Sequence, residues 1–224
     1  MQKYQTFIAL ILITVFSLAL VLIRISYSGQ ITYVFLLWNL FLAWLPLLFA
    51  ALAIRWQKRP FLALSAAFLW LLFFPNAPYL VTDLIHLRSK APVPLWYDLI
   101  LLLDFALLGL FLGFVSLRMM QRLINGRWGA AAGWTFAIFV LSIGGLGVFI
   151  GRFLRWNSWD LFVQPLSLTA DILSNLAEPR TIVISGLLAL LMLFAYLIFS
   201  LDIGSLPQSK PYHKHQYPVS EDAY

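Results

Sequence analysis

The chain has 224 residues, of which 62% are hydrophobic and only 11% are charged, and its mean hydropathy is +0.88. A soluble domain averages about 25% charged residues, so this composition excludes an ordinary soluble fold and predicts an integral membrane protein. The formal net charge is +6, and the lack of cysteine excludes disulfides, thiolate nucleophiles and cysteine-ligated metal clusters.

Apolar stretches of about 20 residues, long enough to cross roughly 30 Å of hydrocarbon, predict the membrane spans. Six are expected, over residues 4–23, 33–54, 61–80, 95–117, 128–150 and 181–201. The predicted fold is therefore all-α: a polytopic membrane helix bundle of six transmembrane helices within residues 1–206. Short interfacial helices are expected on its outer side, among them Pro165–Ala177.

The third predicted span contains two prolines. Its apolar part, Phe61–Phe74, would give only about 21 Å of helix, so the crossing must continue to Leu80. Because Pro75 and Pro78 lack a backbone N–H, we expect this helix to be broken near its outer end, where irregular backbone would border a polar cavity. A plain helix stop above the membrane is the alternative.

The distribution of Lys and Arg predicts the orientation. Nine basic residues fall on one predicted side, whereas the six on the other side are balanced by six acidic residues, so the first side carries the whole net charge of +6. We therefore expect a multi-pass protein of the plasma (inner) membrane with both termini cytoplasmic. The polar, proline-punctuated residues 207–224 are predicted to form a disordered cytoplasmic tail.

Asp83 and His86 are the first candidates for chemistry, because they are three residues apart in a segment, Thr82–Arg88, that could be helical. On one helical face the aspartate could orient the imidazole, which makes the pair candidate acid–base groups or metal ligands. A surface pair on an interfacial helix is the alternative. The metal, if any, is unknown, and the sequence requires no cofactor.

Arg152 and Arg155 follow the fifth predicted span in a stretch dense in arginine and tryptophan, Gly151–Asp160. On a continued helix they would share a face, and arginine forks suit phosphate or carboxylate, so both are candidate anion-binding residues. An aromatic belt with arginines anchoring the helix end is the alternative. The residues expected to line the pocket are Asn76, Tyr79, Asp98, Asn157, Trp159 and Asp160.

Asp104 is the most specific single functional candidate, because it lies about 9 Å deeper in the predicted fourth span than Asp98. An intramembrane carboxylate is a functional candidate by default, and Arg152 is a plausible partner. A hydrogen bond between helices would explain it as well. Three Gly-x-x-x-Gly faces predict close helix packing; they begin at Gly109, Gly129 and Gly147.

Three longer strings carry a resemblance to a known family. They are Phe74–Leu87 (FPNAPYLVTDLIHL), Pro94–Asp98 (PLWYD) and Gly151–Asp160 (GRFLRWNSWD). Through them the chain resembles, over about residues 30–200, the uncharacterised bacterial membrane family called domain of unknown function 1361. The resemblance implies a polytopic plasma-membrane protein and no established activity, substrate or catalytic residue.

The leading functional hypothesis is an outward-facing polar pocket that binds or processes an anionic or phosphorylated lipid. The alternatives are a small-ion or solute transporter that uses Asp104, and a non-catalytic accessory membrane subunit. Whether the protein is an enzyme stays open. The expected partners are membrane lipids and, through the glycine faces, a membrane protein or a second copy of the chain. Nucleic acid is not an expected partner.

Overall fold

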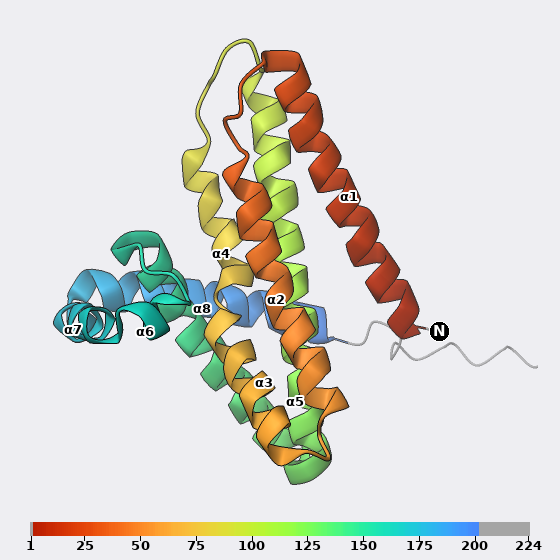
Figure 1. The fold of residues 1–224 in the computed structure, drawn as a ribbon, viewed down its shortest axis with the longest axis vertical. Helices are drawn as coiled ribbons and strands as arrows, with labels where there is room; N and C mark the ends of the chain where they lie inside the picture. The colour runs from red at the N-terminus through yellow and green to blue at the C-terminus, as the bar shows by residue number, and fades with distance from the viewer. Residues whose placement is uncertain (1, 202–224) are drawn as a thin grey trace, which may run out of the picture.

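The computed structural model describes residues 2–201, and nearly all of them are helical (Figure 1). The elements are α1 (Gln2–Ser28), α2 (Phe35–Arg55), α3 (Pro60–Phe73), α4 (Asn76–Thr82), the 3₁₀ helix η1 (Asp83–His86), α5 (Leu95–Phe149), the π-helical turn η2 (Ile150–Leu154), α6 (Asp160–Val163), α7 (Pro165–Leu176) and α8 (Pro179–Ser200). No β-strand occurs in this range, so the predicted all-α class is confirmed. The tail predicted over residues 207–224 lies outside the described residues.

Five segments within residues 2–201 are long and apolar enough to cross a membrane. They are Gln5–Ser28, Phe35–Arg55, Pro60–His86, Leu95–Leu154 and Pro179–Ser200. The sequence predicted six, and the difference arises because the expected fourth and fifth spans belong to one helical segment of 60 residues. The basic stretch between these two spans is itself helical, since residues 118–127 contain no proline that would stop the helix.

α5 bends sharply at Gly129, which has φ 84° and ψ 171° and so departs from helical geometry. Glycine adopts a positive φ without the steric cost that a Cβ would impose. Figure 1 shows the two halves of α5 meeting in a V at the lower end of the view. The chain therefore reverses one residue after the predicted start of the fifth span.

The interruption between α3 and α4 is small. Phe74 and Pro75 separate the two helices but keep right-handed helical angles, and α4 continues roughly along α3 (Figure 1). The Tyr79 amide donates to the Pro75 carbonyl oxygen at 3.0 Å, so regular hydrogen bonding resumes within one turn. The prolines thus interrupt the bonding pattern more than the direction of the chain.

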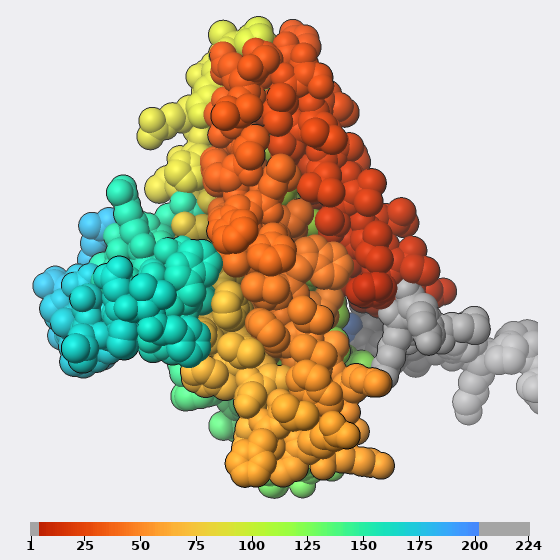
Figure 2. Space-filling model, in the orientation of Figure 1, coloured from red at the N-terminus to blue at the C-terminus, as the bar shows by residue number. Residues whose placement is uncertain are grey.

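The interior consists of two apolar clusters. One is formed by α1, α2, α4 and the first half of α5, and the other by α2, α3, α8 and both halves of α5. Large apolar side chains also cover the outside, for example Leu12 at 63% exposure and Phe61 at 86%. Such a surface would drive association in water but suits a bilayer. The lobe of α6 and α7 projects to one side of the bundle (Figure 2).

Glycines allow the close packing that the sequence predicted. A Cβ on Gly109 would collide with the carbonyl oxygen of Ala77 in α4, and one on Gly147 would collide with the ring of Pro75. Both of these glycine faces of α5 are therefore occupied within the chain, against the α3–α4 segment.

Candidate functional site

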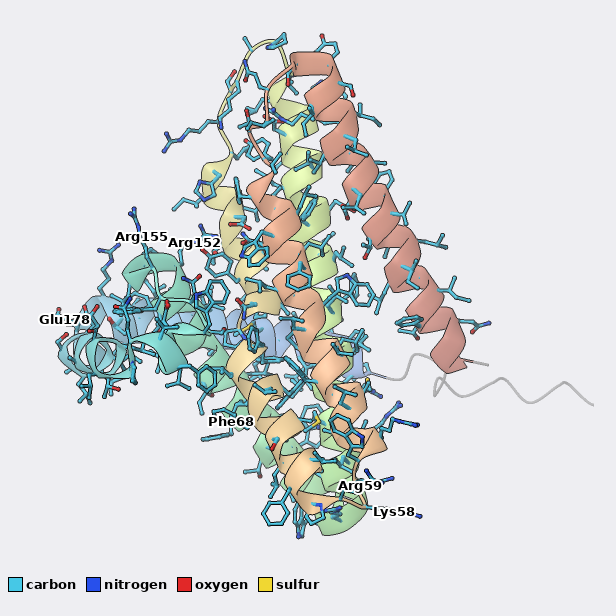
Figure 3. The ribbon with its side chains drawn as sticks, viewed as in Figure 1. Lys58, Arg59, Phe68, Arg152, Arg155 and Glu178 are labelled. Carbon is cyan, nitrogen blue, oxygen red and sulfur yellow. The ribbon has the colours of Figure 1, made fainter. Side chains whose placement is uncertain are left out.

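An ion pair joins the end of α5 to the end of α4. Arg152, in the π-helical turn η2, donates through Nη2 to Asp83 at the start of η1, whose side chain is only 1% exposed. A 3₁₀ helix has three residues per turn, so His86 lies on the same side of η1 as Asp83. The Nη1 of Arg152 accordingly lies 3.0 Å from Nε2 of His86. Figure 3 shows Arg152 beside α4, above the α6–α7 lobe.

The remaining contacts of Arg152 hold its guanidinium in place. Nε donates to the Thr82 hydroxyl at 2.8 Å, and the guanidinium stacks on the Tyr79 ring at 4.1 Å from its centroid. Because an arginine can only donate, Nε2 of His86 must accept, which places the imidazole proton on Nδ1. The lone pair that a general base would use is therefore occupied in this arrangement.

Two further groups stabilise this cluster. Asn39 in α2 donates through Nδ2 to Oδ2 of Asp83 at 2.9 Å, so each carboxylate oxygen has its own donor. The Tyr33 hydroxyl donates to the His86 carbonyl oxygen at 3.2 Å. The predicted site did not include Asn39. Its position as an asparagine within the otherwise apolar second span could have indicated it.

Arg155 does not share a face with Arg152, contrary to the sequence expectation. The π-helical turn ends at Leu154, and Arg155 adopts a left-handed conformation with φ 62°. Its side chain is exposed and has no hydrogen bond or ion pair with any described residue. The positive charge of Arg155 therefore has no partner among the described residues, whereas Asp83 neutralises that of Arg152.

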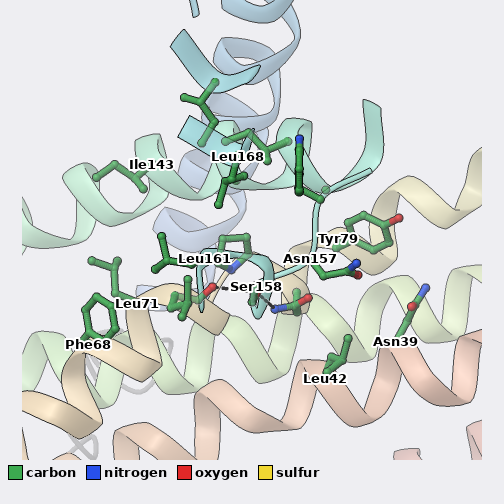
Figure 4. A pocket seen from close by; sticks show the side chains of 18 of the residues that line it. Asn39, Leu42, Phe68, Leu71, Tyr79, Ile143, Asn157, Ser158, Leu161 and Leu168 are labelled. Atoms are coloured by element: carbon green, nitrogen blue, oxygen red, sulfur yellow. Dashed lines mark hydrogen bonds between the residues drawn. The ribbon is translucent and has the colours of Figure 1, made fainter. Parts of the chain in front are cut away.

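A cavity of about 360 Å³ lies next to this cluster, between the α3–α4 segment, α2, the second half of α5 and the α6–α7 lobe. Its polar lining residues are Asn39, Asn76, Tyr79, Asn157 and Ser158, together with Trp156. Its apolar lining includes Leu42, Phe68, Leu71, Leu72, Ile143, Leu161, Leu168 and Ile172. In Figure 4 Asn39, Tyr79 and Asn157 lie on one side of the cavity, and Phe68, Leu71 and Ile143 lie on the other.

Hydrogen bonds anchor the polar side to the proline-interrupted segment. Asn76 donates through Nδ2 to the Ser158 hydroxyl at 2.9 Å (Figure 4). It also donates to the Phe73 carbonyl oxygen at 3.0 Å. The Ser158 hydroxyl donates in turn to the Leu72 carbonyl oxygen at 3.1 Å. The carbonyl groups at the end of α3 thus find partners in side chains that line the cavity, as buried backbone groups must.

The structure brings only half of the expected lining residues to the cavity. Asn76, Tyr79 and Asn157 line it. Trp159 lies outside the lining and packs on Trp38 at a centroid distance of 6.2 Å. Asp160 is also outside, because its Oδ2 accepts the Asn157 backbone N–H at 2.7 Å and serves to close the turn.

Asp98 lies elsewhere, because Arg24 of α1 binds it. Arg24 donates through Nε to Oδ1 at 2.7 Å and through Nη2 to Oδ2 at 3.0 Å, and the two side chains are 1% and 0% exposed. Asp104 contacts Ser17 of α1, whose hydroxyl donates to Oδ2, and not Arg152. Both aspartates therefore join α5 to α1, away from the cavity.

Asp83 and His86 are too few to make a metal site by themselves. Among the described residues no group of three or more His, Cys, Asp or Glu side chains could hold a metal ion.

A family model described as "Protein of unknown function (DUF1361)" matches residues 38–197. The chain belongs to this family. The region that matches DUF1361 contains Asn39, Asp83, His86 and Arg152 but not Arg24 or Ser17, so the cluster lies within the family region and α1 lies outside it. No curated protein and no solved structure matches the chain.

Proposed function

We propose that the protein is a plasma-membrane protein that crosses the bilayer six times, with both termini in the cytoplasm, and binds an anionic or phosphorylated lipid in its cavity at the outer leaflet. The V of α5 at Gly129 supports two crossings by this helix, and the basic residues near the corner support its cytoplasmic position. The ion-paired cluster would then lie at the outer end.

The observation that carries the proposal is the amphipathic lining of the cavity. Amides and hydroxyls lie on one side and aliphatic and aromatic side chains on the other, as a lipid with a polar head and apolar chains requires. Phe68 is 52% exposed and Ile143 is 37% exposed, so the apolar side reaches the surface of the protein. A lipid could therefore enter sideways from the bilayer.

Arg155 supports a preference for anionic lipid. It has no partner among residues 2–201, and the following residue, Trp156, lines the cavity. Arg152 carries no net attraction because of its pair with Asp83, and its role is to hold Tyr79 and η1 at the cavity wall. With Nε2 of His86 occupied by Arg152, the geometry supports binding of the lipid more than a chemical step on it.

The test is native mass spectrometry of the protein extracted in mild detergent, with identification of the lipids that stay bound. We expect a stoichiometric anionic lipid on the parent protein and its loss in Ile143→Trp, which fills the apolar side of the cavity. The matched control is Ile138→Trp, on the same helix at 47% exposure but outside the lining, which should retain the lipid. Equal lipid retention by both variants would contradict the proposal.

A further inference from the structure

A second, smaller cavity of about 240 Å³ lies where α7 ends and α8 begins. Its lining residues include Phe149, Phe153, Glu178, Arg180 and Thr181. It shares no lining residue with the first cavity.

The N-terminus of α8 borders this cavity and offers unpaired donors. α8 is 22 residues long and begins at Pro179, which has no N–H, and the N-cap residue Glu178 makes no side-chain capping bond. The backbone N–H groups of Arg180 and Thr181 have no acceptor among the described residues. Such a helix end carries a partial positive charge of about half a unit and favours anions.

The Thr181 side chain is the independent observation that indicates a ligand. Thr181 is only 3% exposed, lines the cavity and makes no hydrogen bond with any described residue. The Thr181 oxygen is not among the fully enclosed polar atoms that lack a partner in the described residues, so it borders accessible space, and the cavity that Thr181 lines is where a partner would lie. The Arg180 guanidinium, stacked over the Phe153 ring at 5.3 Å from the centroid, adds a full positive charge at the same place.

The negative charge of Glu178 disfavours a ligand with more than one negative charge. Glu178 is also a lining residue, and its negative charge opposes that of Arg180, which leaves roughly the half charge of the helix end. Inorganic phosphate and phosphate monoesters carry about −1.5 to −2 at neutral pH and would be repelled by Glu178, whereas a diester carries only one negative charge. Phe149 and Phe153, stacked at 5.0 Å, suit the apolar neighbours of a diester.

We propose that this cavity binds a singly charged phosphodiester, the head group of a phospholipid, through the Thr181 hydroxyl, the free N–H groups at the start of α8 and the Arg180 guanidinium. The phospholipid is a second ligand beside the one in the first cavity, and its site uses different residues.

The experiment measures calorimetric binding of dihexanoylphosphatidylglycerol in detergent by the Ile143→Trp protein, whose first cavity is filled. Adding Thr181→Val, which removes the hydroxyl and keeps the shape of the side chain, should weaken binding about tenfold. Arg180→Gln should weaken it at least as much. The matched control Thr169→Val, on exposed α7 with its hydroxyl bonded to Pro165, should change nothing.

Four results would overturn the inference. The first is unchanged affinity in both Thr181→Val and Arg180→Gln. The second is no binding by the Ile143→Trp protein. The third is equal binding of dihexanoylglycerol, which lacks the phosphate. The fourth is tighter binding of inorganic phosphate than of the diester. Because the first cavity is filled throughout, each result leaves the proposed function to its own test.

Discussion

Arg152, in the turn that ends α5, pairs with Asp83 at the start of η1, 69 positions earlier in the chain. The pair connects two segments that both line the first cavity. Tyr79, four residues before Asp83, and Gly151, one residue before Arg152, are both lining residues. Its position makes it a structural support of the cavity and a less suitable anion-binding site, because the carboxylate already occupies the guanidinium.

The Arg152–Asp83 pair should contribute strongly to stability. Replacing Arg152 with Met leaves a buried carboxylate without its cation, which costs about 3 kcal/mol and should lower the thermal midpoint in detergent by roughly 6–12 °C. The double variant Arg152→Met, Asp83→Leu should recover much of the loss, because no charge remains unpaired. If Arg152→Met melts like the parent protein, the pair is not formed.

The buried pair of Arg24 and Asp98 should behave as a second, independent support. Asp98→Asn leaves the Arg24 charge uncompensated at 1% exposure, and we expect a loss of about 3–5 kcal/mol. Asp160→Asn, at a turn near the protein surface, is the control and should cost about 1 kcal/mol or less. Apparent unfolding temperatures measure both effects. Equal losses in the two variants would contradict the assignment of Asp98 to Arg24.

The contact of α5 with α4 predicts opposite effects for two glycines. Gly109→Ala would press a methyl group onto the Ala77 carbonyl oxygen, and backbone cannot move aside easily, so we expect a loss of about 1–3 kcal/mol. Gly186→Ala meets nothing within 4 Å and should gain up to about 1 kcal/mol from helix propensity. Thermal melting compares the two. Similar behaviour would mean that α4 does not pack on Gly109.

Asp104→Asn distinguishes lipid binding from transport. The asparagine oxygen can accept the same hydrogen bond from the Ser17 hydroxyl, so stability should change little. Lipid retention in native mass spectrometry should also be unchanged, because Asp104 lies outside the cavity lining. Loss of a solute flux in liposomes, with lipid retention intact, would instead favour the transporter hypothesis.

The helices could be predicted from the sequence more accurately than the side-chain contacts between them. Composition and apolar run length were sufficient for the helices, and the spacing of Asp83 and His86 correctly placed them on one side of a helical turn. The interpretation of Arg152 as the partner of Asp104 was wrong, because depth along a helix does not determine which way a side chain points. That direction depends on tertiary packing, and Ser17 on α1 faces Asp104 instead.

Arg24 shows why the second ion pair was missed. The first span was expected to end at residue 23, which leaves Arg24 outside it, whereas α1 continues to Ser28 and Arg24 is buried. A base at a helix end and Asp98 at the matching end of α5 could have suggested a pair. Arg155 was misplaced for a local reason, since nothing in the sequence marks the π-helical turn or the left-handed residue after it.

The most direct test of lipid binding is photo-crosslinking with a phosphatidylglycerol that carries a diazirine in its acyl chain, followed by peptide mapping. We predict adducts at Phe68, Leu71 and Ile143 that excess unlabelled phosphatidylglycerol abolishes. We also predict adducts at Ile138 that it does not abolish, because that residue is exposed outside the cavity lining. Two results would contradict a lipid site in this cavity. One is that adducts at the cavity residues resist competition, as those at Ile138 do. The other is that no adducts form at the cavity residues.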